Sequence, residues 1–469
     1  MAVTEPATTA LPGAPEGILR RQSLRESAAR TYARSLPIVP VRARGLTIEG
    51  ADGRRYLDCL SGAGTLALGH NHPVVLEAIR EVLDSGAPLH VLDLATPVKD
   101  AFTTELFATL PRELAEHGRI QFCGPAGTDA VEAALKLVRT ATGRTGMLAF
   151  TGAYHGMTAG ALAVSGGARD VQVTRLPYPH NYRCPYGVGG DRGAEIAARW
   201  TENLLDDPKG GVPAPAGMIV EPVQGEGGVN PAPDGWLRRM REITASRAIP
   251  LIADEVQTGV GRTGTFWAVE HSGVVPDVMV LSKAIGGSLP LAVIVYRDSL
   301  DVWKPGAHAG TFRGNQLAMA AGAATLAYVR ENRLAERAAV LGARMLGQLQ
   351  GLAADHPCIG DVRGRGLMIG VELVDPERED LTSGNPPPPA PALAAVVQQE
   401  CLRRGLIVEL GGRHSSVVRL LPPLTLTDEQ AVAVLDRLAD AVAAATRTPH
   451  PGADAGAGAH HRAETGPSH

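Results

Sequence analysis

The sequence lacks the features that mark disulfide-rich, metal-binding and membrane proteins. Its five cysteines lie far apart and include no Cys-x-x-Cys pair, so we predict neither a disulfide framework nor a zinc site. No stretch approaches the roughly eighteen consecutive apolar residues of a membrane span, and the first residues show no apolar run typical of a signal peptide. We therefore expect a cytoplasmic protein with no metal and no membrane partner.

An excess of basic charge is also missing. The chain has 45 Lys and Arg residues against 49 Asp and Glu residues, which gives a formal net charge of -4. A nucleic-acid-binding surface normally needs clustered, surplus Lys and Arg. We therefore expect small molecules, or a second copy of the chain, as partners.

Two common catalytic signatures are absent as well. The early strand-like segment is not followed by the GxGxxG turn that binds dinucleotides, and the chain contains no GxSxG of the serine hydrolases. These absences argue against a nicotinamide-dependent enzyme and against a hydrolase of that type.

The apolar residues that are present predict an α/β protein. With 469 residues, of which 44% are hydrophobic, the chain is long enough for one large core and a smaller one. Short apolar runs bounded by Gly and Pro alternate with helical patterns between about residues 118 and 296, which predicts a mostly parallel sheet. These runs are GRIQFC, GMLAF, AGMIVEP, IPLIADE, PDVMVLS and LPLAVIVY.

Both ends of the chain are predicted to contribute to a second, smaller domain. Asp52-Gly53 between two short strand-like runs predicts a hairpin, and GLMIGVEL, GLIVEL and VVRLLP predict later strands. Thr427 and Gln430 form the capping box of a last helix. The predicted divisions are disordered ends at 1–25 and 446–469, a small α+β domain from 26–80 and 326–445, and a large domain at 81–325.

Three segments carry residues suited to one cofactor. Gly127 and Thr128 begin a predicted helix, where free amides and a hydroxyl suit a phosphate, although such a pair is more often a simple cap. Asp254 and Lys283 each follow an apolar strand, at the edge where parallel sheets bind ligands. Pyridoxal 5'-phosphate (PLP) requires a phosphate site, an acid for its ring nitrogen and an amine, so the combination favours PLP.

The segments GTDAVEAALKL, EPVQGEGG, DEVQTG and SKAIGG occur in this order along the chain. With this order and spacing the chain resembles the class III aminotransferases, and the resemblance extends over about residues 40–445. It implies the fold type I architecture of PLP-dependent transferases, with a large domain built on a mostly parallel sheet. It also implies a homodimer whose active sites lie at the subunit interface.

The resemblance implies roles for the residues around the cofactor. Lys283 would bind PLP covalently through its amine and later move the substrate proton, and Asp254 would keep the pyridine nitrogen protonated. Gln257 would reach the phenolic oxygen of the ring. Tyr154 would stack on the ring face, with His155 beside it.

It also implies phosphate-binding and substrate-binding residues. Gly127 and Thr128 would hold the phosphate together with the partner subunit's Thr311. Arg419 matches the arginine that binds a substrate carboxylate, because its guanidinium can grip that group with two hydrogen bonds. Glu226 matches the glutamate that pairs with this arginine while a substrate presents its distal amine.

The cofactor residues do not select the substrate, since the family shares them. LPYPHNYRCPYG from Leu176 and GTFRGNQLAMAAG from Gly310 are similar to the bacterial family members that form 2,4-diaminobutyrate. We therefore expect L-glutamate to donate its amine to L-aspartate 4-semialdehyde, giving L-2,4-diaminobutyrate and 2-oxoglutarate. This step supplies ectoine, siderophore or peptide-antibiotic biosynthesis.

Other functions remain open at this point. Family members that act on ornithine, acetylornithine or 4-aminobutyrate share the cofactor residues, and an aminomutase or racemase has the same fold. A DNA-binding regulator built on the PLP fold would need a basic helix-turn-helix region. The roughly forty residues ahead of the resemblance are too few for one, since a recognition module spans several helices.

Overall fold

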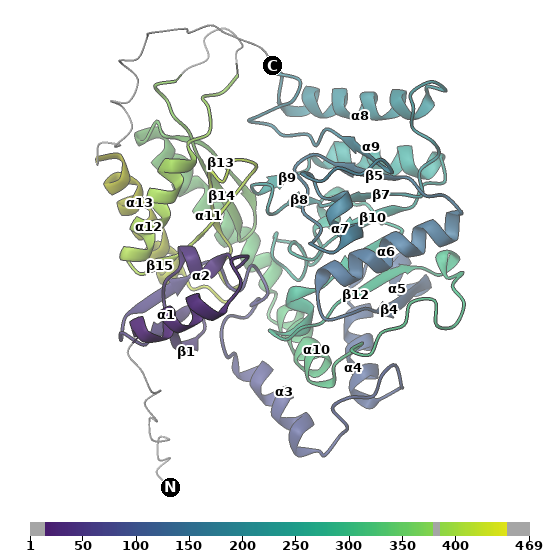
Figure 1. The fold of residues 1–469 in the computed structure, drawn as a ribbon, viewed down its shortest axis with the longest axis horizontal. Helices are drawn as coiled ribbons and strands as arrows, with labels where there is room; N and C mark the ends of the chain where they lie inside the picture. The colour runs from purple at the N-terminus through teal and green to yellow at the C-terminus, as the bar shows by residue number, and fades with distance from the viewer. Residues whose placement is uncertain (1–14, 379–384, 448–469) are drawn as a thin grey trace, which may run out of the picture.

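A seven-stranded sheet forms the centre of the larger of two lobes, on the right in Figure 1. The computed structural model describes residues 15–378 and 385–447. The strands are, in spatial order, β4 (Gly118–Phe122), β12 (Val293–Arg297), β11 (Val278–Leu281), β10 (Leu251–Asp254), β7 (Gly217–Val220), β5 (Met147–Phe150) and β6 (Val173–Leu176).

The sheet is mostly parallel, as the sequence predicts. Only β12 runs against its two neighbours, while β6, β5, β7, β10 and β11 pair in parallel. Six strands coincide with the six predicted apolar runs, and those inside the sheet are nearly continuous in apolar residues, as strands covered on both faces usually are. The seventh, β6, was not predicted, because its sequence VTRL has the polar residues Thr174 and Arg175 at its centre.

Helices cover both faces of this sheet. Helices α6 (Gly127–Thr142) and α7 (Ala159–Val164) contribute to the hydrophobic core on one face. Helices α8 (Gly190–Asp206) and α9 (Asp234–Ser246) pack against the other face. With both faces covered, the functional groups can gather only at the edges of the sheet, where its strands end.

The smaller lobe contains two four-stranded sheets, and the first of them joins the two ends of the chain. The predicted hairpin forms, with β2 and β3 antiparallel across the turn that holds Asp52 and Gly53. Strand β15 then pairs in parallel with β3, so the C-terminal half completes the N-terminal sheet. This sheet is ordered β1 (Pro40–Arg44), β2 (Thr47–Gly50), β3 (Arg55–Asp58) and β15 (Leu406–Ile407).

The second small sheet contains the later strands of the chain. Segment GLIVEL, expected as one strand, is divided between the two sheets, since β15 joins β3 and β16 joins β17. The predicted class of fold, a large α/β domain with a smaller α+β domain from both chain ends, is confirmed. The second sheet is ordered β13 (Ile359–Arg365), β14 (Met368–Leu373), β17 (Val417–Leu420) and β16 (Glu409–Gly411).

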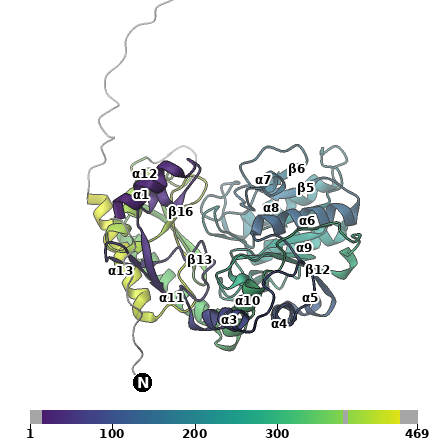
Figure 2. The same ribbon diagram turned by 60° about the horizontal axis from the view of Figure 1, so that its bottom comes forward.

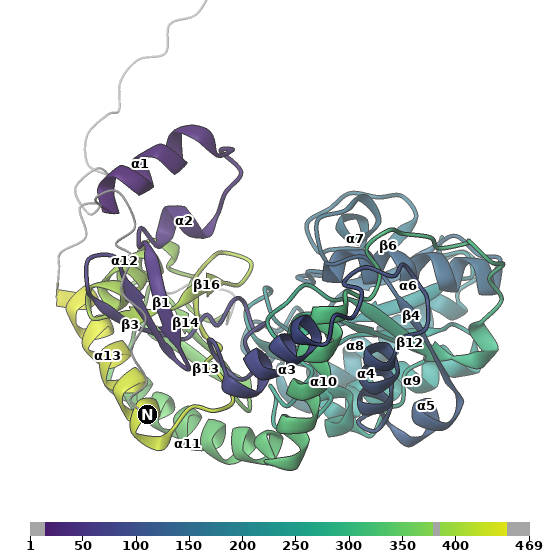
Figure 3. The ribbon, with the colours of Figure 1, turned by 90° about the horizontal axis from the view of Figure 1, so that it is seen from below.

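Two consecutive helices connect the lobes. Helix α10 (Gln316–Glu331) packs against α3 (Pro73–Asp84) and α4 (Pro97–Phe107), while α11 (Leu334–Asp355) packs against β13 of the small lobe. Figure 2 shows the two lobes side by side, and Figure 3 shows α11 running beneath the small lobe toward α10. The connection therefore crosses between the lobes without a long loop.

The N-terminal end differs from the expectation. Helix α1 (Pro15–Arg25) occupies residues that were predicted to be disordered, so that prediction does not hold for 15–25. Proline at the first helical position, Glu16 in the first turn and Arg25 in the last all favour a helix there. Residues 1–14 lie outside the described part of the chain.

The C-terminal helix begins as predicted. In α13 (Asp428–Arg447) the Gln430 amide donates to the Thr427 hydroxyl oxygen at 3.2 Å, and the Thr427 amide donates to the Gln430 side chain at 3.0 Å. The helix includes Thr446 and Arg447, and the rest of the predicted disordered tail lies outside the described residues. The residue numbers proposed as domain boundaries stay predictions.

Within the described ranges, no helix is both long enough and apolar enough to cross a bilayer. The helices instead bury their apolar faces against the two lobes, as in α6 with seven buried residues.

The lobes also meet at a tight turn between β13 and β14. Gly366 has a φ of 55°, and a Cβ atom there would lie 2.5 Å from the carbonyl carbon of Thr263 in the large lobe. Next to this contact the buried Arg262 donates to the Leu367 carbonyl at 3.1 Å. Only glycine fits both the backbone conformation and the space.

We predict that Gly366→Ala lowers the free energy of unfolding by about 2–5 kcal/mol, since it adds both backbone strain and a clash. The matched control is Gly347→Ala in α11, where the new methyl group meets no atom within 4 Å. That change should be neutral or stabilise by up to about 1 kcal/mol. Urea unfolding followed by circular dichroism measures the free energy of unfolding of both variants. Equal values for the two variants would contradict the importance of the contact between the lobes at Gly366.

Candidate active site

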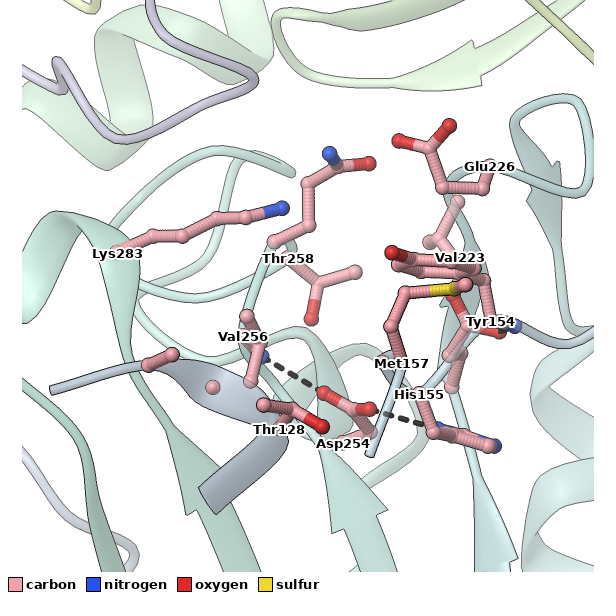
Figure 4. Close-up of a pocket in the computed structure, with 15 residues that line it drawn as sticks. Thr128, Tyr154, His155, Met157, Val223, Glu226, Asp254, Val256, Thr258 and Lys283 are labelled. Carbon is pink, nitrogen blue, oxygen red and sulfur yellow. Dashed lines mark hydrogen bonds and ion pairs between the residues drawn. The ribbon is translucent and has the colours of Figure 1, made fainter. Parts of the chain in front are cut away.

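A cavity of about 320 Å³ lies at the carboxyl edge of the large sheet. Figure 4 shows its side chains converging from several strand ends. Most of the site residues predicted from the sequence line this cavity, because they lie at or near the carboxyl ends of neighbouring strands. The predicted residues on its wall are Gly127, Thr128, Tyr154, His155, Glu226, Asp254, Gln257 and Lys283.

Asp254 is the last residue of β10 and lies deep in the cavity. Its Oδ2 atom is 2.7 Å from His155 Nδ1, and its Oδ1 atom accepts from the Val256 amide at 3.1 Å. Burial by itself lowers the pKa of His155, but the hydrogen bond and the charge of Asp254 outweigh it, so this pKa is raised. The pair therefore fixes the orientation of the Asp254 carboxylate in the cavity.

Lys283 follows β11 and starts a short 3₁₀ helix, Lys283–Gly286. Its φ is 53°, a left-handed conformation that non-glycine residues rarely adopt outside functional or turn positions. The bend turns the side chain toward the cavity (Figure 4). Burial lowers the pKa of Lys283, against the opposing charge of Glu226, which favours the neutral, nucleophilic amine.

Gly127 and Thr128 open α6 and form one end of the cavity. A Cβ atom at Gly127 would lie 3.1 Å from a methyl group of Val256, so a larger residue there would crowd this wall of the cavity. The Thr128 hydroxyl is 2.6 Å from the Thr158 hydroxyl. The adjacent Asp129 carboxylate accepts from the Ala126 amide at 3.0 Å.

Tyr154 is held by a residue that the sequence did not single out. Its amide donates to Glu221 Oε2 at 3.0 Å, and the Gly225 amide donates to Glu221 Oε1 at 3.1 Å. Burial raises the pKa of Glu221 to about 7. Glu221 thus fixes both the Tyr154 loop and the turn that carries Glu226. Its position directly after β7 was the available signal, the same one that identified Asp254.

Gln257 links the cavity to the small lobe. Its Nε2 atom donates to the Ala63 carbonyl at 3.1 Å, and its Oε1 atom lies 3.5 Å from Arg419 Nη1. A Cβ atom at Gly225 would lie 1.9 Å from that Oε1 atom, so glycine is required beside it. The position of Gln257 therefore depends on both lobes.

Arg419 lies behind the cavity wall, in β17, and its side chain is fully buried. Its Nη2 atom donates to Glu226 Oε1 at 2.7 Å, the pairing that the family resemblance implies. The same Nη2 atom also contacts Glu409 in β16, which the sequence did not suggest. Glu409 sits in the apolar run GLIVEL, where an acidic residue in a strand was the only signal.

Thr311 is the one predicted site residue that lies away from this cavity. It is exposed, and its carbonyl oxygen is 3.0 Å from His90 Nε2. Its neighbour Phe312 is 71% exposed, which is unusual for a large aromatic side chain. Within one chain, therefore, Thr311 does not join the other phosphate-site residues.

The donor set fits PLP. The cavity is lined by the amine of Lys283, the buried carboxylate of Asp254 and the first residues of α6, Gly127 and Thr128. These are the three groups that PLP requires. Within the described residues there is no cluster of three or more His, Cys, Asp or Glu side chains suited to a metal ion.

Comparisons with known sequences agree with this chemistry. The Aminotransferase class-III family matches residues 28–442. The chain is 55% identical over 435 residues to a diaminobutyrate--2-oxoglutarate aminotransferase of Rhizobium meliloti (strain 1021), with 91% of this chain and 92% of the relative covered. A protein of the same name from Haemophilus influenzae is 47% identical over 432 residues, covering 90% of this chain and 94% of the relative.

Solved structures give the same result. An amine transaminase from an uncultivated Pseudomonas species, in its PLP-bound form, has a TM-score of 0.79 at 32% identity and covers 90% of this chain and 98% of its own. An (S)-enantioselective omega-transaminase from Thermomicrobium roseum has a TM-score of 0.80 at 28% identity, covering 92% and 99%. Because the family match spans both lobes and every residue that lines the cavity, this chain belongs to the class III aminotransferases, with PLP as its cofactor.

Proposed function

We propose that this protein transfers an amino group from L-glutamate to L-aspartate 4-semialdehyde, forming L-2,4-diaminobutyrate and 2-oxoglutarate. The observation that carries the proposal is the 55% identity to a relative named diaminobutyrate--2-oxoglutarate aminotransferase. This match extends over both lobes. The Arg419–Glu226 pair supports the proposal. Glutamate has a carboxylate on the carbon that carries its reacting amine, whereas diaminobutyrate has none beside its distal amine.

The cavity residues would hold the cofactor from several sides. Asp254, supported by His155, would pair with the ring nitrogen, Gln257 would bind the phenolic oxygen, and Tyr154 would cover the ring. Gly127 and Thr128 would bind the phosphate, which the amides at the N-terminus of α6 favour. When bound, PLP supplies an electron-poor ring that stabilises negative charge on the carbon next to the transferred nitrogen.

Lys283 has two tasks in this scheme. Its amine would hold PLP covalently in the resting enzyme, and once free it would take up and return the proton of the substrate carbon. Its lowered pKa suits both tasks, since a neutral amine is needed for attack and for accepting a proton. The donor and the acceptor would therefore use the same Lys283 in turn, one in each half-reaction.

Arg419 and Glu226 distinguish the two substrates. Glutamate carries its α-carboxylate on the reacting carbon, and Arg419 binds it with two hydrogen bonds once Glu226 moves aside. Diaminobutyrate reacts at its distal amine, where the carbon carries no carboxylate, and Glu226 then neutralises Arg419. The Glu226 side chain is 31% exposed to the cavity, so it has room to move.

We further propose a homodimer with shared sites. Several large apolar side chains are exposed on the loops around α3 and α10, and a protein normally covers such a cluster. Thr311 on the same surface would then reach the phosphate site of the partner subunit. The exposed apolar residues are Leu89, Leu92, Leu94 and Phe312.

The first prediction concerns the substrates. When the holoenzyme is mixed with one amino donor at a time, L-2,4-diaminobutyrate and L-glutamate should change the visible absorption of the bound cofactor rapidly. Ornithine, acetylornithine and 4-aminobutyrate should react slowly, and Lys283→Ala should not respond to any donor. Preference for one of those three compounds would reject the proposed substrates and leave the family assignment intact.

The second prediction concerns Asp254. Asp254→Asn should keep the fold but lower kcat by about 10²–10³-fold or more, because the amide cannot hold the ring nitrogen in its charged form. Asp277→Asn is the matched control, since Asp277 lies at the opposite end of the sheet and pairs with Arg241. The control should lose stability only, and a nearly silent Asp254→Asn would show that the cofactor is oriented differently.

The third prediction tests the shared site. Lys283→Ala and Thr311→Glu should each be inactive as pure dimers. If subunits are unfolded together and refolded as a mixture, heterodimers contain one intact site and about a quarter of wild-type activity should return. If light scattering shows that dimers have formed but the mixture recovers no activity, Thr311 does not contribute to the active site of the partner subunit.

A further inference from the structure

Arg419 has two carboxylate partners, and they are held in different ways. Glu409 lies directly opposite Arg419 in the antiparallel pair β16–β17, so the two side chains leave the same face of the sheet. Glu226 lies instead on the turn between β8 (Val223–Gln224) and β9 (Asn230–Pro231). One partner is therefore fixed by strand pairing, while the other belongs to a turn at the cavity.

Exposure separates the two glutamates further. The Glu409 side chain is 11% exposed and the Glu226 side chain 31%, whereas Arg419 is fully buried. Only Glu226 lines the cavity. A substrate carboxylate can therefore displace Glu226, but Glu409 has no comparable path away from the guanidinium.

Both glutamates contact the same nitrogen of Arg419. The Nη2 atom serves Glu226 and Glu409, while Nη1 faces only the Gln257 oxygen at 3.5 Å, which is a weak contact. A substrate carboxylate can thus bind at Nη1 and take the place of Glu226 on Nη2. Throughout this exchange Glu409 keeps the buried guanidinium paired, which avoids the cost of an isolated buried charge.

The cluster also has an unequal charge balance. One guanidinium faces two carboxylates, so negative charge exceeds positive charge within this three-residue cluster, and the Lys283 amine offsets that excess only when it is protonated. Burial raises the pKa of Glu409, and the charge of Arg419 opposes that rise. Glutamate carries one net negative charge at neutral pH and 2,4-diaminobutyrate one net positive charge. The excess of negative charge therefore disfavours glutamate and favours the diamine.

We infer that Glu409 is a positioning residue that sets substrate preference, because it weakens the grip of Arg419 on the glutamate carboxylate and favours the cationic diamine. This inference rests on the proposed function. It goes beyond the displacement of Glu226 by a substrate carboxylate. Glu409, which does not line the cavity, would set the relative affinities for the two amino donors.

The test measures each half-reaction of the holoenzyme alone, from the concentration dependence of the cofactor absorption change. Glu409→Gln keeps a hydrogen-bond acceptor for Arg419 but removes the charge. The apparent dissociation constant for L-glutamate should fall roughly tenfold and that for L-2,4-diaminobutyrate should rise severalfold. Glu409→Asp should keep the wild-type ratio, because it restores the charge.

A merely structural role for Glu409 predicts another result. If Glu409 only neutralises a buried arginine, its loss loosens Arg419 and both constants rise together, which would overturn the inference. Glu372→Gln is the matched control, since Glu372 is a buried partner of Arg363 in the same lobe and does not line the cavity. It should leave the ratio of the two constants unchanged.

The two levels of proposal fail in distinguishable ways. If the wild-type protein does not react with diaminobutyrate, the proposed substrate is wrong. If it reacts with both donors and Glu409→Gln shifts both constants in one direction, only the role of Glu409 is wrong. Thermal unfolding of each variant identifies any loss of fold.

Discussion

The carboxyl ends of β5, β7, β10 and β11 meet at one edge of the large sheet, and the cavity depends on that arrangement. Each of these parallel strands delivers a polar group at or just beyond its end. Glu221 follows β7, Asp254 ends β10, and Lys283 follows β11 after one residue. Because the backbone of the strands is hydrogen-bonded on both sides, these groups are placed with little freedom, as catalysis requires.

Buried charges are the second constraint on the site. An isolated ion in such surroundings would be strongly destabilising, so each has a partner within contact distance. Asp254 is paired with His155, and Arg419 is paired with Glu226 and Glu409. The pairs do more than cancel charge, since they fix the orientation of groups that face the cofactor and substrate. They also connect the two lobes, because Arg419 belongs to the small lobe and Glu226 to the large one.

The site residues easiest to predict from the sequence are those at or just beyond the end of a recognisable apolar strand. Asp254 and Lys283 were identified in this way, and the apolar runs before them form β10 and β11. Sequence reasoning missed Glu409, because the interaction with Arg419 arises from pairing of two strands whose register cannot be read from either strand alone. It also missed α1, whose composition suggested disorder while its terminal charges favoured a helix.

By itself the sequence determined the class of fold, the cofactor chemistry and the identity of most cavity residues, since these depend on local patterns and on motifs at fixed spacing. Tertiary structure alone decided how those residues meet. It divided GLIVEL between two sheets, gave Arg419 a second carboxylate and left Thr311 outside the cavity of its own chain. The physical reason is that strand register, burial and the left-handed bend at Lys283 follow from contacts between segments far apart in the chain.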